Sequence, residues 1–167
     1  MSKVIAFITD GTEESECLIA VDLLRRADID TELVSCSGSR EILSSHKLRI
    51  IADKTFEEAS FEDADMLFVP GGVPGVPNLA AHEGLANALK AQAASDKYIA
   101  AVCAGPSILG GLGLLNGKNA TCFPGWEDKL TGANYTAEGV TVDGKILTGR
   151  GLGFSVDLAL KMIEVLE

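Results

Sequence analysis

The stretch "AAVCAGPS", residues 100–107, decides how the chain folds around it. Its first residues form an apolar run typical of a strand buried on both faces, and the Ala-Gly-Pro after Cys103 ends that strand and opens a helix. A strand that turns abruptly into a helix projects the residue at the bend above the sheet, in a nucleophile elbow. The sequence therefore predicts a thiol at such an elbow.

Two other segments repeat this order of apolar run, glycine-bearing turn and helical pattern: "KVIAFITDGTEE" (3–14) and "DMLFVPGGVPG" (65–75). Continuous apolar strands that alternate with helices predict a mainly parallel sheet covered by helices on both faces, with right-handed crossovers. A length of 167 residues suits one core. We therefore expect a single doubly wound α/β domain over residues 1–167.

The other elements follow from periodicity and turn residues. In chain order they are a helix that begins at Thr12 with the apolar stripe Cys17, Leu18, Val21 and Leu24, a strand over 31–37, an antiparallel excursion over 40–53, a helix over 79–95, a helix from 106, a hairpin over 140–148 that turns at Asp143-Gly144, and a helix over 155–167.

Composition excludes several classes of protein. A net charge of −10 without clusters of Lys and Arg excludes a nucleic-acid surface, so a small molecule or a protein is the expected partner. There is no apolar run of about 20 residues and no signal-peptide cleavage pattern, so we expect a cytoplasmic protein. The four cysteines lack the spacing of zinc sites or disulfide scaffolds. We expect free thiols, no metal and no cofactor.

The three glycine-bearing turns lie at the carboxyl ends of parallel strands, where open α/β sheets bind ligands. Cys103 is the candidate nucleophile, because the unpaired N–H groups of the following helix favour a thiolate and lower a cysteine's pKa. The alternative is that Cys103 is a small apolar residue that ends a core strand.

Glu16 is the second candidate, because on a helical wheel it heads the apolar stripe Ala20, Leu23 and Ala27. Burial there raises the pKa of a carboxyl group and favours the neutral acid, which donates a hydrogen bond to a thiolate or carries a proton. The alternative is a solvated acid that complements the helix dipole.

Gly71 and Gly72, with Ala104, are candidates for backbone donors to a developing oxyanion or an oxidised sulfur. The alternative is that the two glycines only form a turn. Neither histidine, His46 or His82, follows Cys103, and each suits an ordinary surface position. A complete Cys-His-Asp triad is therefore not predicted.

The motifs "DGTEESE" (10–16), "VPGG" (69–72), "AAVCAGP" (100–106) and "LTGRGLG" (147–153) together resemble the ThiJ/PfpI superfamily, in particular its Parkinson-disease-associated deglycase branch and the small bacterial homologues of that branch. The resemblance implies a flavodoxin-like sandwich, usually a homodimer, with an oxidation-sensitive cysteine on the elbow.

By position, the resemblance makes Cys103 that cysteine, Glu16 the protonated carboxyl that bonds it, and Gly72 and Ala104 backbone donors. Arg26 and Arg150 match arginines near the dimer interface and the rim of the active site.

The chain departs from the family pattern at several positions. Phe123 precedes Pro124 where many eukaryotic members have histidine, and Ala104 follows the cysteine where the protease-like branch has histidine. His46 replaces an arginine of the deglycase branch. The extra C-terminal helix of longer members is absent after residue 167, so we expect a more open pocket.

Three functions are compatible with these residues. The first is a glutathione-independent glyoxalase or deglycase that acts on 2-oxoaldehydes such as methylglyoxal, or on their protein adducts, through Cys103 and Glu16. The alternative is a redox sensor or chaperone that is controlled by oxidation of Cys103 to sulfinic acid. The third, a cysteine peptidase, requires a histidine beside Cys103. Cys17 and Cys122 are expected either to pack in the core or to supply a resolving thiol.

Overall fold

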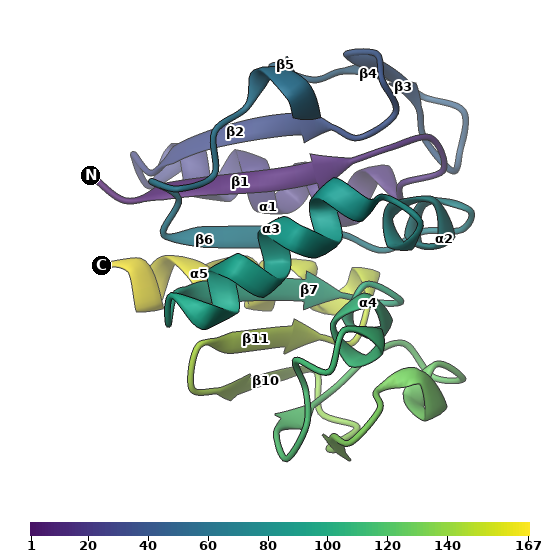
Figure 1. The fold of residues 1–167 in the computed structure, drawn as a ribbon, viewed down its shortest axis with the longest axis vertical. Coiled ribbons are helices and arrows are strands. Elements are labelled where there is room, and N and C mark those ends of the chain that lie inside the picture. The colour runs from purple at the N-terminus through teal and green to yellow at the C-terminus, as the bar shows by residue number, and fades with distance from the viewer.

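A computed structural model describes residues 1–167 and contains a central seven-stranded sheet (Figure 1). Its strand order is β10-β11-β7-β6-β1-β2-β5, and only β10 is antiparallel to its neighbour. The strands are β1 (Lys3–Ile8), β2 (Asp30–Ser35), β5 (Lys54–Thr55), β6 (Met66–Val69), β7 (Tyr98–Val102), β10 (Val140–Asp143) and β11 (Ile146–Gly149). The predicted α/β architecture is confirmed.

Helices cover both faces of this sheet (Figure 1). Helices α1 (Glu14–Arg26) and α5 (Ser155–Leu166) pack together on one face, and α2 (Gly75–Ala80), α3 (Glu83–Ala94) and α4 (Pro106–Gly111) lie on the other. Because alternate strand residues point to opposite faces, β1 sends Ala6 toward α1 and Phe7 toward α3, and both are fully buried. This burial on both faces explains the continuous apolar runs.

The order of the strands places the functional edge. From β1 the chain moves outward to β2 and β5, then returns to β6 on the other side of β1 and continues to β7 and β11. The winding therefore reverses between β1 and β6, and a crevice forms outside the carboxyl ends of such strands. In Figure 1 these ends lie at the right, beside α2 and α4.

The first helix differs in detail from its prediction. Its N-cap is Glu13, whose carboxylate accepts the Glu16 N–H at 2.8 Å, whereas the buried Thr12 hydroxyl instead accepts the Thr9 N–H at 2.9 Å. Leu18, which was expected in the buried stripe, is 39% exposed. Ala20 is buried next to Cys17, Val21 and Leu24 in its place. The position of Glu16 on the apolar face is confirmed.

The helix predicted over 79–95 is in fact two helices, because the chain breaks at Ala81 and His82. The His82 ring nitrogen accepts the Leu85 N–H at 3.0 Å and so caps α3. A histidine is an uncommon cap, and the pattern of apolar residues runs through the break.

Both predicted hairpins are present, and one of them turns one residue later than predicted. Strands β3 (Glu41–Leu43) and β4 (Arg49–Ile51) form the expected antiparallel excursion. In the β10–β11 hairpin Asp143 still pairs with Ile146, so the two-residue turn is Gly144-Lys145, one position later than predicted.

The remaining elements are short. They are β8 (Asn119–Ala120), β9 (Asn134–Tyr135) and the 3₁₀ turns η1 (Phe56–Glu58), η2 (Glu127–Lys129) and η3 (Leu152–Phe154). None of the helices combines the length and the apolar character that a membrane crossing requires.

Candidate active site

Cys103 follows β7 directly and has a φ of +63°, in the left-handed region. A side chain other than glycine pays roughly 1–2 kcal/mol for this conformation, so the surroundings must hold it. The Cys103 N–H donates to the Gly149 carbonyl at 3.0 Å, and its carbonyl accepts the Phe123 N–H at 2.9 Å. The residue is partly exposed, as the elbow predicts.

The Glu16 carboxyl and the Cys103 sulfur meet over Gly71. A Cβ atom at Gly71 would lie 2.5 Å from Glu16 Oε1, 2.6 Å from Cys103 Cβ and 3.2 Å from Cys103 Sγ. Glycine is therefore required there, because a side chain would push apart the two groups. Glu16 is only 1% exposed, and its Oε1 has no hydrogen-bond partner of good geometry.

Burial controls the proton affinity of both groups. Burial raises the pKa of Glu16 to about 7, and the negative charge of Glu13 adds to this, whereas hydrogen bonding to Cys103 and to the Gly71 N–H opposes it. Burial also raises the pKa of the Cys103 thiol to about 12, with the Glu16 carboxylate as the next cause. Only the Ala104 N–H lowers the pKa of Cys103.

Burial and the charge of Glu16 therefore oppose the thiolate that the sequence predicts at this helix N-terminus. The helix α4 is short, and the single amide of Ala104 is outweighed by burial and by Glu16. These effects favour a thiol at Cys103, beside a carboxyl whose pKa of about 7 lets it hold or release a proton near neutral pH. Such a carboxylate can accept the thiol proton when the sulfur attacks.

The N–H groups predicted as backbone donors, at Gly71, Gly72 and Ala104, have different partners in the structure. None of the N–H groups of Gly71, Gly72 and Ala104 donates to a backbone carbonyl. The Gly71 N–H interacts with Glu16, and the Ala104 N–H with Cys103. Gly72 has a φ of +106°, and a Cβ there would lie 2.3 Å from the Glu13 nitrogen, so it must be glycine.

The β3–β4 hairpin brings His46 to the rim, beside the first turn of α1. Its Nδ1 lies 3.0 Å from Glu14 Oε1 and 3.5 Å from Glu13 Oε1. These three residues offer ligand atoms within 4.8 Å of one another, a grouping that the sequence did not reveal. Each already has a protein partner, and the positive end of α1 opposes a cation there.

The two arginines lie in different places. Arg26 is in the last turn of α1, exposed and paired with Asp22, whereas Glu16 is in the first turn. Ten residues of helix span about 15 Å, so Arg26 lies outside this site. Arg150 lines a hollow with Phe123 and Phe154 next to the elbow, and its buried Nε has no partner. Phe123 is 48% exposed.

The other cysteines and the second histidine lie elsewhere. Cys17 is fully buried in the core beneath α1, and Cys122 is fully buried in the core on the opposite face of the sheet. Burial raises the pKa of Cys17 to about 12. His82 caps α3 and packs against Phe56 with centroids 4.5 Å apart and the rings tilted, whereas His46 lies against Glu13 and Glu14, so neither histidine is a partner for Cys103.

Sequence reasoning missed Glu13, which ties the two halves of the site together. Its carboxylate caps α1 at Glu16, and its own N–H donates to the Gly71 carbonyl at 2.9 Å. The signal was present, since an acid three residues before Glu16 has the spacing of an N-cap.

The structure is thus a doubly wound α/β sandwich in which a cysteine on a left-handed elbow faces a buried carboxyl across a glycine. The DJ-1/PfpI family model matches residues 2–165, and the chain belongs to this family.

Sequence relatives agree with this assignment. The chain is 37% identical over 163 residues to Protein DJ-1 homolog B of Arabidopsis thaliana, covering 97% of this chain and 37% of the relative. It is 33% identical to the Parkinson disease protein 7 homolog of Danio rerio, covering 98% of this chain and 89% of the relative. It is 31% identical to the glutathione-independent glyoxalase DJR-1.2 of Caenorhabditis elegans, covering 99% of this chain and 89% of the relative.

The chain spans 37% and 42% of the length of two Arabidopsis relatives. Among solved structures, the C103A mutant of a DJ-1 superfamily protein from Salmonella typhimurium superposes with a TM-score of 0.95 at 32% identity, covering 99% of this chain and 90% of that one. Oxidized DJ-1 of Toxoplasma gondii superposes with a TM-score of 0.95 at 32% sequence identity, covering 99% of this chain and 91% of that one. These neighbours confirm the flavodoxin-like fold.

Proposed function

We propose that this protein is a cysteine-dependent, glutathione-independent glyoxalase that acts on small 2-oxoaldehydes such as methylglyoxal, and on their early adducts with proteins. The observation that carries the proposal is the meeting of Cys103 Sγ and Glu16 Oε1 over Gly71, at the edge where the sheet reverses its winding. The similarity to a glutathione-independent glyoxalase supports it.

The reaction begins when the sulfur adds to the aldehyde carbon and forms a hemithioacetal. Because burial and Glu16 keep Cys103 protonated, the thiol proton passes to the Glu16 carboxylate as the carbon–sulfur bond forms. The former carbonyl oxygen becomes an oxyanion, which the N–H groups of Gly72 and Ala104 can stabilise, since neither donates to a backbone carbonyl. Glu16 then returns the proton to that oxygen.

Glu16 next transfers a proton between the two substrate carbons. Its carboxylate removes the hydrogen from the carbon that bears sulfur, and the resulting enediol is protonated at the adjacent carbon. The product is a thioester of lactate, and no outside oxidant or reductant is needed because one carbon is oxidised while the other is reduced. Water then hydrolyses the thioester to release lactate and the thiol.

The test is lactate formation from methylglyoxal by the purified protein without glutathione. Cys103→Ala and Glu16→Ala are each expected to abolish turnover, whereas Cys122→Ala leaves it intact, because Cys122 lies in the core. If both site variants keep wild-type turnover, the mechanism is wrong. Parallel assays with glyoxal and glycated peptides define the substrate range.

Oxidation of Cys103 to sulfinic acid is the second candidate function. It is supported by the backbone N–H groups around a partly exposed sulfur that donate to no backbone carbonyl, and by the oxidized relative from Toxoplasma. Intact-mass spectrometry after stoichiometric peroxide is expected to show two added oxygen atoms that are absent in Cys103→Ala. Negligible turnover of aldehydes together with this oxidation would favour the sensor. The peptidase candidate lacks the histidine that it requires.

We also infer a homodimer. Apolar side chains remain exposed on α1 and on the β3–β4 hairpin, where Leu18 is 39%, Leu48 52% and Ile51 73% exposed. Sedimentation velocity of the wild type and of Ile51→Glu tests this: the variant is expected to shift toward monomer if this surface is the interface.

A further inference from the structure

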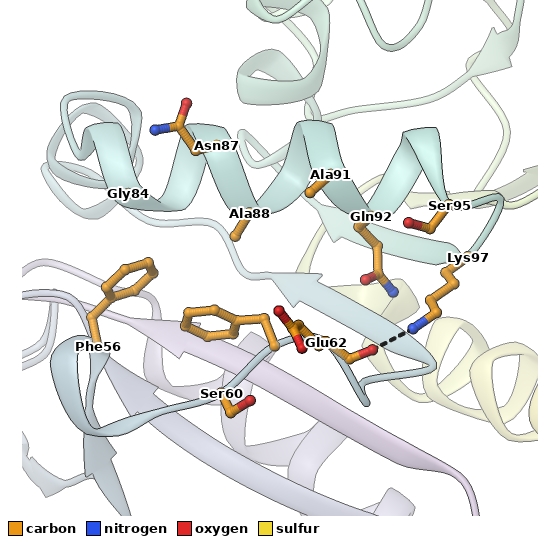
Figure 2. Close-up of a pocket in the computed structure, with 11 residues that line it drawn as sticks. Phe56, Ser60, Glu62, Gly84, Asn87, Ala88, Ala91, Gln92, Ser95 and Lys97 are labelled. Carbon is orange, nitrogen blue, oxygen red and sulfur yellow. Dashed lines mark hydrogen bonds between the residues drawn. The ribbon is translucent and has the colours of Figure 1, made fainter.

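A trough on the face of the molecule opposite α1 shares no residue with the active site. It has a volume of about 570 Å³ and lies between α3 and the segment from Phe56 to Glu62 (Figure 2). This volume lies within the usual range of small-molecule sites, roughly 300–1,000 Å³. The proposed reaction uses none of its lining residues.

One end of the trough is aromatic. The rings of Phe56 and Phe61 lie with their centroids 4.7 Å apart. A Cβ at Gly84 would lie 2.6 Å from Phe56 Cε1, so this glycine allows the ring to rest directly against α3. Ala88 also lines this part, and its small side chain leaves room in the trough beside the two rings, which pack against Phe7 on their inner side.

The other end carries a fixed hydrogen-bond acceptor. Gln92 is only 4% exposed, and its Nε2 donates to the Ala64 carbonyl at 3.2 Å and to the Tyr98 carbonyl at 3.1 Å. These two bonds fix the orientation of the amide. Its Oε1 accepts no hydrogen bond from the protein and is not fully buried. In Figure 2 this oxygen faces the trough.

A negative charge lies beside this acceptor. The Glu62 carboxylate has no ion pair, because Lys97 Nζ donates instead to the Glu62 backbone carbonyl (Figure 2). Because Lys97 also lines the trough, both signs of charge are present, and it is the unfilled Gln92 acceptor beside Glu62 that favours a ligand with a hydrogen-bond donor.

We propose that this trough binds a planar aromatic ring that carries an N–H donor, such as an aryl carboxamide, with the ring against Phe56 and Phe61 and the N–H on Gln92 Oε1. This binding is independent of Cys103. The three features that recognise the ligand are the aromatic pair, the buried acceptor and the neighbouring negative charge.

Three small probes separate these features in NMR titrations of the whole protein. Benzamide has the ring and the donor, benzoate has the ring without the donor, and cyclohexanecarboxamide has the donor without the planar ring. Benzamide is expected to shift the Gly84 amide and the Gln92 side-chain amide saturably. It should bind about fivefold more tightly than either of the others, as one hydrogen bond or one aromatic contact suggests.

Variants locate the binding and exclude the active site. Ala88→Trp fills the trough and should abolish the shifts, and Cys103→Ala should leave them unchanged. Glu62→Gln, at an exposed position, should narrow the preference for benzamide over benzoate about two- to fivefold, whereas the matched control Glu83→Gln, an exposed acid elsewhere on α3, should not.

Two results overturn the proposal: no saturable shift at the solubility limit of benzamide, or equal binding of benzamide and benzoate. Shifts that disappear in Cys103→Ala, or that persist fully in a folded Ala88→Trp protein, also overturn it, because the ligand then binds elsewhere.

Discussion

The first turn of α1 carries two buried glutamates that face different regions and behave in opposite ways. Glu16 faces Cys103 and is 1% exposed, and burial raises its pKa to about 7. Glu14 faces the β3–β4 hairpin and is 6% exposed. Burial raises its pKa too, but hydrogen bonds from its own backbone N–H, from His46 and from Ser45 bring the pKa of Glu14 below its usual value.

The difference shows that partners, rather than burial, decide what a buried carboxyl can do. The hairpin gives Glu14 a hydroxyl and an imidazole, so it stays charged and holds the hairpin against the helix. On the Cys103 side, burial outweighs the hydrogen bonds that Cys103 and the Gly71 N–H make to Glu16, so a proton can enter and leave near neutral pH. Glu14 therefore holds the hairpin to α1, whereas Glu16 is suited to proton transfer.

The largest effect is expected from Gly71→Ala, which breaks the Cys103 side alone. The new Cβ would lie 2.5 Å from Glu16 Oε1 and 2.6 Å from Cys103 Cβ, so one of the two groups must move. A displacement of this size is expected to lower turnover of methylglyoxal roughly a hundredfold or more. Gly111→Ala is the control, since a Cβ there meets nothing within 4 Å; equal activity in both variants would contradict the geometry.

Glu16→Gln and Glu14→Gln should change stability in opposite directions. The raised pKa of Glu16 means that its favourable contribution is complete below pH 4.5 and is lost as the pH rises through about 7. Glu16→Gln should therefore unfold like the wild type near pH 4.5 and be more stable at pH 8, by roughly 3 kcal/mol at most.

The lowered pKa of Glu14 gives the reverse sign, because its contribution is present above its usual pKa and is lost in acid. Glu14→Gln should be less stable than the wild type at pH 7 and should approach it in acid. Urea unfolding from pH 4 to pH 8 measures both variants. Parallel pH profiles for the two would show that the glutamates do not differ as described.

The pH dependence of turnover sharpens the role of Glu16. If its carboxylate is the base, kcat/KM is low at acid pH, rises through about pH 7 and levels off above it. Glu13→Gln keeps an oxygen to cap α1 but removes the charge that raises the pKa of Glu16, so the rise should move to lower pH by up to about one unit. A profile that falls through pH 7 would show that the neutral acid is the active form.

The smallest effect is expected from His46→Ala. Loss of the imidazole should raise the pKa of Glu14, and it should cost less than about 1 kcal/mol of stability because the His46 side chain is 72% exposed. Turnover should remain near the wild-type value. An NMR titration of the Glu14 carboxyl carbon measures the shift, and an unchanged titration would show that Ser45 and the backbone suffice.

Much of the site could be predicted from the sequence because local rules place it. The apolar runs define β1, β6 and β7, the "CAGP" break defines the elbow at Cys103, and helical periodicity puts Glu16 on the buried face. The splitting of α3 from α2, the capping by Glu13 and the exposure of Leu18 escaped because neighbouring elements or single side chains decide them. The compartment, the homodimer and the catalytic roles stay predictions.

The sequence by itself determined where the main strands lie and which end of the sheet carries the thiol and the carboxyl, since both follow from the period of the apolar residues and the positions of the glycines. Only the tertiary structure decided the proton affinities. Whether Cys103 holds a thiol or a thiolate depends on desolvation and on the charge of Glu16, and both depend on atoms brought together from three strand ends. Likewise, His46 meets Glu14 across 32 positions only when the hairpin folds back, so no local pattern could show that contact.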